Sequence, residues 1–127
     1  MKVQKLTPVA IVDRVEPSLE FWADRLGFEK LAEVAEGDAI GFALLERDGI
    51  EMMLQTRSGL ARDGPGRAGP PGGVTVGFYL EVADLEPVRR AIAGLEVVMA
   101  ERTTFYGKRE ISVCEPGGHL VTFAADA

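Results

Sequence analysis

The chain has 127 residues, 46% of them hydrophobic and 27% charged, a balance typical of one compact globular unit. Its net charge of −6 argues against nucleic-acid binding, which needs a basic surface. No apolar run approaches the roughly 20 residues of a membrane helix, the N-terminus lacks signal-peptide features, and the single Cys114 cannot form an internal disulfide. We expect a cytoplasmic protein that binds neither nucleic acid nor a membrane.

The first half of the chain predicts a strand, a helix and three further strands. The strands are expected at 6–12, 28–35, 40–46 and 50–56, and the helix at 17–26. Four apolar residues recur on one face of this helix: Leu19, Trp22, Ala23 and Leu26. Asp48-Gly49 joins the last two strands and is a strong hairpin signal.

The second half repeats this order. Strands are expected at 74–82, 95–101, 109–114 and 119–124, and a helix at 85–93 with Asp84 as its N-cap. Gly117-Gly118 joins the last two strands, 69 residues after Asp48-Gly49. Each half is therefore a βαβββ module.

The segment 57–73 separates the two modules. It holds six glycines and three prolines, which predicts a linker with no helix and no central strand. The chain is thus divided into module one at 1–56, a linker at 57–73 and module two at 74–127. A lid over a binding cavity and a plain solvated linker both remain open for this segment.

Three stretches carry a resemblance to a known family. "VEPSLEFWADRLGFEKL", "RDGIEMMLQ" and "FYGKREISVCEPGGHLVTF" resemble the first helix and the two closing hairpins of the glyoxalase, bleomycin-resistance and extradiol-dioxygenase superfamily, the vicinal oxygen chelate proteins. Glu115 stands where Asp is usual in the last turn. The resemblance implies an α+β fold in a single domain, 1–127, whose two βαβββ modules form curved mixed sheets that enclose a cavity. It also implies a homodimer.

Enzymes of this superfamily hold a divalent metal on the first and fourth strands of each module. The resemblance places these positions at Thr7, Met53, Thr75 and Thr122. None is a normal ligand of zinc, nickel, iron or manganese, so we expect no metal and no cofactor. The lone His119 is expected to be exposed at the turn, and too isolated to anchor a site.

Strand alternation supports this placement on the cavity side. In module two, Tyr79 alternates with an apolar row that should cover the helix. Pairing across Asp48-Gly49 puts Phe42 opposite Gln55 and Leu44 opposite Met53.

The first hypothesis is a metal-free protein that binds a small organic molecule, cationic or aromatic, and sequesters an antibiotic or toxin. Its ligand-binding residues would be Thr7, Val9, Phe42, Met53, Gln55, Thr75, Tyr79, Tyr106, Arg109 and Thr122. Tyr106 and Arg109 would close the pocket rim or simply cap the sheet.

Two alternatives stay open. One is a lyase, isomerase or dioxygenase with an atypical site, in which Glu51 or Glu81 would be the catalytic base. The other is a degenerate member whose pocket is filled by core side chains. Cys114 is expected in or near the core and not as a nucleophile.

Overall fold

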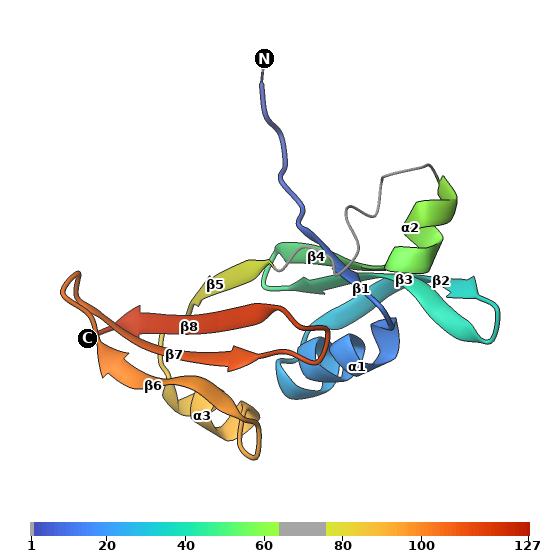
Figure 1. The fold of residues 1–127 in the computed structure, drawn as a ribbon. Helices are drawn as coiled ribbons and strands as arrows, with labels where there is room; N and C mark the ends of the chain where they lie inside the picture. The colour runs from blue at the N-terminus through green and yellow to red at the C-terminus, as the bar shows by residue number, and fades with distance from the viewer. Residues whose placement is uncertain (1, 64–75) are drawn as a thin grey trace. The chain divides into compact units, whose positions relative to one another are not determined.

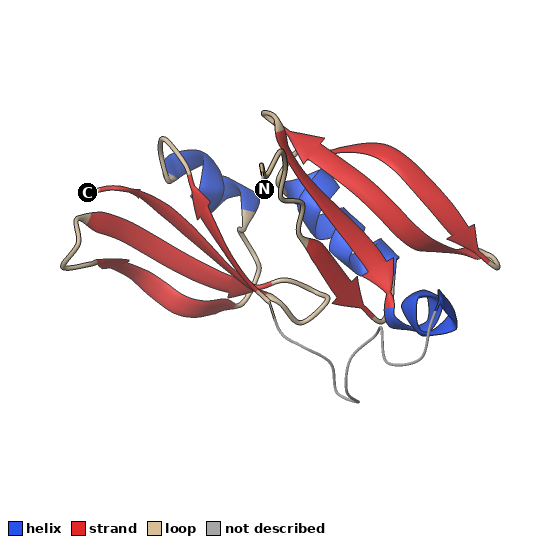
Figure 2. Ribbon diagram, turned by 90° about the horizontal axis from the view of Figure 1, so that it is seen from above, coloured by secondary structure: helices blue, strands red, loops and turns tan. Residues whose placement is uncertain are grey.

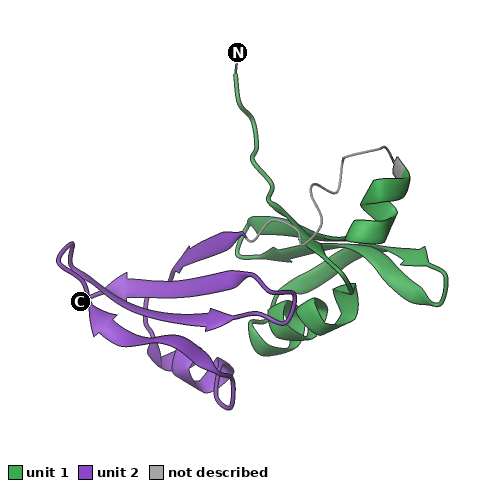
Figure 3. Ribbon diagram, viewed as in Figure 1, with its two compact units in different colours: residues 1–74 green, residues 75–127 purple. Residues whose placement is uncertain are grey.

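A computed structural model describes residues 2–63 and 76–127 of the chain (Figure 1). The chain divides into two compact units, residues 1–74 (unit 1) and 75–127 (unit 2), which we describe separately (Figure 3). Across the described ranges, no helix has the length and apolar character that crossing a membrane demands.

Unit 1 has the predicted βαβββ order, followed by one further helix. Its strands are β1 (Val9–Val12), β2 (Glu29–Glu36), β3 (Ala39–Arg47) and β4 (Ile50–Thr56), and its helical segments are α1 (Val15–Leu19), η1 (Glu20–Arg25) and α2 (Arg57–Asp63). The sheet order is β1-β4-β3-β2, with β1 parallel to β4 and the other pairs antiparallel. This is a mixed sheet, as expected.

One face of this sheet is buried under α1, which contacts β3 and β4 (Figure 2). The alternate side chains Ala43, Leu45, Met52 and Leu54 are buried, together with Val15 of the helix. The Glu16 carboxylate accepts a 2.7 Å hydrogen bond from the Ile40 N–H and so ties α1 to the start of β3. We call the opposite face of the sheet the helix-free face of unit 1.

The predicted boundaries in this unit shift for identifiable reasons. The helix begins at Val15 rather than 17, and its second part is a π-helix, in which the Leu26 N–H bonds the Phe21 carbonyl at 3.1 Å. Strand β1 begins at Val9 rather than 6. Pro8 accepts a hydrogen bond from the Met53 N–H at 2.9 Å, but it has no N–H to return one.

The expectation that 57–73 contains no helix was wrong for 57–63, which form α2. Five of the six glycines and all three prolines lie from 64 onward, so the average over the segment concealed a stretch compatible with a helix. The Thr56 hydroxyl accepts the Gly59 N–H at 3.1 Å, in the manner of an N-cap. The remaining linker residues, 64–73, lie outside the described residues.

Unit 2 also has the predicted βαβββ order. Its elements are β5 (Gly77–Glu81), α3 (Glu86–Ala91), β6 (Val97–Thr103), β7 (Lys108–Cys114) and β8 (Leu120–Asp126), and the sheet order is β5-β8-β7-β6. The Asp84 carboxylate accepts the Glu86 N–H at 3.0 Å and so supports the start of α3. Buried apolar residues of the helical segment and the sheet form its core: Leu85, Val88, Ile92, Val113, Val121 and Phe123.

Both hairpins form where the glycine turns predict them. Asp48 and Gly49 have φ of 53° and 80°, which suits the twist of the flanking strands. The predicted pairs Phe42–Gln55 and Leu44–Met53 are confirmed. In unit 2, the Gly118 N–H bonds the Glu115 carbonyl at 2.9 Å and closes the last turn.

Candidate functional site

The helix-free face of unit 1 is mainly apolar. Val9, Met53 and Leu44 lie side by side on β1, β4 and β3, and Ile11, Gln55 and Phe42 form the next row. The Gln55 amide donates to the Gly41 carbonyl at 3.2 Å. The structure therefore brings four predicted ligand-binding residues, Val9, Phe42, Met53 and Gln55, onto one surface.

Two other predicted residues lie at the margin of this surface. Thr7 is half-buried and precedes β1. Glu51 forms an ion pair with Lys5, so its carboxylate already has a cationic partner. The helix-free face of unit 1 is therefore mainly an apolar surface, and its one carboxylate, Glu51, is ion-paired.

The face of the unit 2 sheet that does not pack on α3, its helix-free face, is polar. Tyr79 of β5 pairs with Thr122 of β8, which pairs with Ser112 of β7. The Ser112 and Thr122 hydroxyls are 2.7 Å apart and hydrogen-bond to each other. Thr75, the remaining predicted residue on this side, lies outside the described residues.

The centre of this face is Glu110, a residue that the sequence reasoning missed. Glu110 is only 2% exposed, although it is a carboxylate on a strand of seven residues. Its Oε2 accepts hydrogen bonds from the Tyr79 hydroxyl at 2.5 Å and from the Tyr106 hydroxyl at 2.6 Å. Arg102, its register partner on β6, approaches Oε1 at 3.5 Å. Two predicted site residues, Tyr79 and Tyr106, therefore hydrogen-bond to the same residue, Glu110, which was not predicted.

A signal for Glu110 was present in the sequence. The Glu115–Gly118 turn fixes the pairing of Ser112 with Thr122, and two residues further along each strand this pairing puts Glu110 opposite Ala124. Residues two apart share a face, so Glu110 had to lie on the same side as Thr122. The missing step was to extend the hairpin register beyond the metal-ligand position.

The hydrogen bonds in this cluster move the pKa values of the carboxyl group and of the two phenols in opposite directions. The phenolic donors Tyr106 and Tyr79 lower the pKa of Glu110, against the opposing effect of burial. The same bond to Glu110 raises the pKa of Tyr79 to about 12 and also raises the pKa of Tyr106. At neutral pH the cluster therefore consists of one carboxylate and two neutral phenols.

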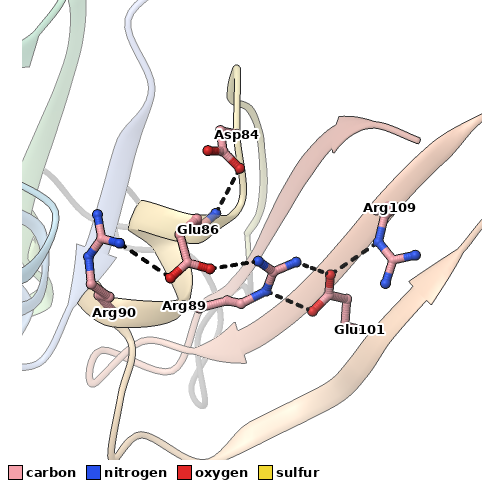
Figure 4. Close-up of polar contacts among 6 residues, drawn as sticks. All are labelled: Asp84, Glu86, Arg89, Arg90, Glu101 and Arg109. Carbon is pink, nitrogen blue, oxygen red and sulfur yellow. Dashed lines mark hydrogen bonds and ion pairs between the residues drawn. The ribbon is translucent and has the colours of Figure 1, made fainter.

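Arg109 lies on the other side of this sheet. Its register partners are Ala125 and Thr103, and its guanidinium Nε lies 3.2 Å from Glu101. Glu101 also accepts two hydrogen bonds, at 2.6 and 3.0 Å, from Arg89 of α3 (Figure 4). These contacts lower the pKa of Glu101 to about 2. The structure therefore does not bring Arg109 to Tyr79 and Thr122.

The structure also gives the exposure and the contacts of three further residues: Glu81, His119 and Cys114. Glu81 is exposed and ion-paired with Lys108 at 3.0 Å. His119, expected to be exposed, is only 2% exposed, and its Nδ1 accepts the Val76 N–H at 3.0 Å. Cys114, expected in or near the core, is exposed at the end of β7.

The family-implied metal positions do not fit a divalent metal. Met53 offers a thioether, and Thr7 and Thr122 offer neutral hydroxyls, none of which offsets the charge of a dication. The Thr122 hydroxyl is also engaged by Ser112. Within residues 2–63 and 76–127, no three side chains of His, Cys, Asp or Glu gather so that they could hold an ion.

Comparison with known proteins identifies a family. The family model described as the glyoxalase/bleomycin resistance protein/dioxygenase superfamily matches residues 5–123. No curated protein sequence matches the chain.

Several solved structures share the fold. A lactoylglutathione lyase from Agrobacterium tumefaciens has a TM-score of 0.75 at 15% identity, over 98% of this chain and 95% of that one. TioX from Micromonospora sp. ML1 has a TM-score of 0.73 at 18% identity, over 97% and 100%. A bleomycin-binding protein in complex with bleomycin has a TM-score of 0.67 at 17% identity, over 98% and 100%. At these identities the likeness establishes the fold alone.

Proposed function

Because the chain belongs to the glyoxalase/bleomycin resistance protein/dioxygenase superfamily, we propose that it binds a small organic molecule without a metal ion. The ligand lies on the helix-free face of unit 2, beside Tyr79, Tyr106 and Thr122. The biological role is sequestration of an antibiotic or toxin, a role in keeping with a structural relative that was crystallised with bleomycin.

The chemistry at Thr122 is the observation that carries this proposal. The superfamily's enzymes place a metal ligand at this point of the last strand, whereas here the Thr122 hydroxyl bonds Ser112 at 2.7 Å. Beside this pair lie the two phenols and the carboxylate of Glu110. Such groups orient an organic ligand by hydrogen bonds and aromatic contacts.

The helix-free faces of the two units differ in the kind of contact that each offers. Val9, Leu44 and Met53 supply apolar contact in unit 1, and Met side chains adapt to irregular ligand shapes. Tyr79 and Glu110 supply polar contact in unit 2. We therefore expect a molecule with an aromatic or cationic part.

A lyase, isomerase or dioxygenase remains the alternative. Its best general base would now be Glu110 rather than Glu51 or Glu81, since both of those are ion-paired. The hydrogen bonds in the cluster favour binding over this alternative. They move the pKa of Glu110 down and that of Tyr79 up, both away from the neutral range in which acid–base catalysts work best.

For the assembly we propose a cytoplasmic homodimer. The resemblance to the superfamily supports this, and both units expose edge strands, β2 and β6, that a second chain could cover. Gel filtration should give 27.4 kDa, twice the chain mass of 13.7 kDa. Elution at the mass of one chain at all concentrations contradicts the dimer.

A thermal-shift screen tests the proposed binding. The library contains aromatic and cationic compounds, including glycopeptide antibiotics, and is run with and without EDTA. We expect stabilisation by at least one compound class, unchanged by EDTA. Stabilisation that EDTA abolishes supports the metalloenzyme alternative. If no compound stabilises the chain, the result supports a degenerate family member whose pocket is filled by core side chains.

A further inference from the structure

Glu110 is a buried charge with a loosely held cationic partner. The carboxylate is 2% exposed, whereas the side chain of Arg102 is 58% exposed and ends 3.5 Å from Oε1. A buried carboxylate is costly unless it is paired, but an exposed arginine is free to leave if another cation replaces it. The two phenols engage Oε2, whereas the cation at Oε1 is an exposed arginine that another cation can replace.

Two exposed tyrosine rings reach this carboxylate with their hydroxyls, and a third aromatic ring packs on one of them. Tyr79 and Tyr106 are each 51% exposed while their hydroxyls bond Oε2. Phe105, which is fully exposed, packs edge-on against Tyr106 with ring centroids 5.0 Å apart. Aromatic faces next to a carboxylate are the environment in which proteins bind organic ammonium groups.

From these contacts we infer that Glu110 is the anchor for a cationic nitrogen of the ligand, and that Arg102 occupies this position in the free protein. The inference rests on the proposed function and specifies its ligand as an organic cation with an aromatic or apolar part. The ligand's N–H groups donate to the Glu110 carboxylate, and its apolar part covers the tyrosine rings. Arg102 swings into solvent, so the carboxylate keeps a partner throughout.

The same two strands supply matched controls on the opposite face of the sheet. Glu101 and Arg109 lie on β6 and β7, as Arg102 and Glu110 do, and they also form an ion pair (Figure 4). Changing Glu101 or Arg109 alters the net charge of the chain by the same amount as changing Glu110 or Arg102. Because the charge change is the same on both faces, the comparison controls for long-range electrostatic effects.

The experiment is a titration of the ¹⁵N-labelled full chain with phenethylammonium chloride at pH 7 and constant ionic strength. The uncharged 2-phenylethanol serves as the matched probe. We expect saturable shifts of the Ser112, Thr122 and Ala124 amides with the cation only. Glu110→Gln should weaken binding about tenfold or more, because a hydrogen bond to a charged group is lost. Arg102→Gln should tighten binding about threefold, because a weak competing ion pair is removed.

The control variants Glu101→Gln and Arg109→Gln should bind the cation as the unchanged protein does. Equal affinity in Glu110→Gln, or weaker binding in Arg102→Gln, overturns the inference. If Glu110→Gln does not fold, the direction of the Arg102→Gln effect decides alone. Absence of saturable shifts with phenethylammonium also overturns it, and the proposed function then survives if other compounds stabilise the chain.

Discussion

At the scale of single residues, Glu110 determines the chemistry of the helix-free face of unit 2. One carboxylate oxygen accepts both phenolic hydroxyls, at 2.5 and 2.6 Å. A phenol that donates to a carboxylate resists ionisation, because its anion would face a second negative charge. The acidity of the two tyrosines therefore reports on Glu110.

The titration of the tyrosines tests this geometry. Tyr79 and Tyr106 are the two tyrosines of the chain, so absorbance at 295 nm reads the site directly. We expect Tyr79 to ionise with a pKa of about 12 and Tyr106 above its usual range, while circular dichroism shows an intact fold. In Glu110→Gln both should move back toward about 10.

Glu101→Gln is the control for this titration, since Glu101 bonds arginines on the other face of the sheet. It should leave the absorbance curve unchanged. Ordinary tyrosine titration in the unchanged protein would refute the Glu110 cluster.

Glu110 also shows where sequence reasoning reached its limit. A charged residue on a strand is normally solvated, and a buried one is costly unless partners surround it. Those partners, Tyr79, Tyr106 and Arg102, come from three other segments of the chain. The hairpin register predicts on which face of the sheet Glu110 lies. Its burial depends on contacts with other segments, which the local sequence pattern does not reveal.

At the scale of elements, strand β8 makes the cluster possible through a small residue. Ala124 lies between Glu81 of β5 and Glu110 of β7 in the register, and it is fully buried. Because its side chain is a single methyl group, the Tyr79 hydroxyl can reach across β8 to Glu110.

We therefore expect Ala124→Leu to break the Tyr79–Glu110 contact. The larger side chain should cost about 1–3 kcal/mol of unfolding free energy through overpacking. It should also lower the pKa of Tyr79. Urea unfolding and the 295 nm titration measure the two effects.

Ala125→Leu is the matched control, because Ala125 is buried on the opposite face beside Arg109. It should be destabilising without changing the tyrosine titration. Identical titration curves for the two variants would contradict the placement of Ala124 under the cluster.

Helix α2 is held by a second carboxylate. Glu36 of β2 accepts hydrogen bonds from the Thr56 and Ser58 hydroxyls at 3.1 and 3.2 Å and pairs with Arg62. Glu36→Ala should speed amide exchange of residues 57–63 about fivefold and change global stability by less than about 1 kcal/mol.

Glu33→Ala is the control on the same strand, because Glu33 pairs with Lys30 on the exposed surface. Hydrogen exchange followed by mass spectrometry should find no change in 57–63 for this variant. Equal exchange in both variants would mean that Glu36 does not hold α2.

The order of elements along both modules and the pairing within their closing hairpins followed from local signals. Alternation and the two glycine turns carry enough information to set the pairing of β3 with β4 and of β7 with β8. Helix α2 (Arg57–Asp63) was missed because the composition was judged over all 17 residues of the segment. The glycines and prolines that exclude a helix lie mostly from 64 onward. The anchor of α2, Glu36, is 20 or more residues away in the sequence.

At the scale of the whole molecule, the two modules share the same strand pairing but differ in the side chains at equivalent positions. Val9 and Met53 pair in unit 1 as Tyr79 and Thr122 pair in unit 2, at offsets of 70 and 69 residues. The first pair is apolar and the second bears two hydroxyls. Neither pair offers an ordinary ligand of zinc, nickel, iron or manganese, which agrees with the proposed metal-free binding.

Metal content is the measurement that tests this claim most directly. The purified chain is equilibrated separately with zinc, nickel, iron(II) and manganese, desalted, and analysed by mass spectrometry of the elements. Thr7, Met53 and Thr122 predict that far less than one ion per chain is retained, whichever metal is offered. Retention of one tightly bound ion per chain would contradict metal-free binding and favour an enzyme.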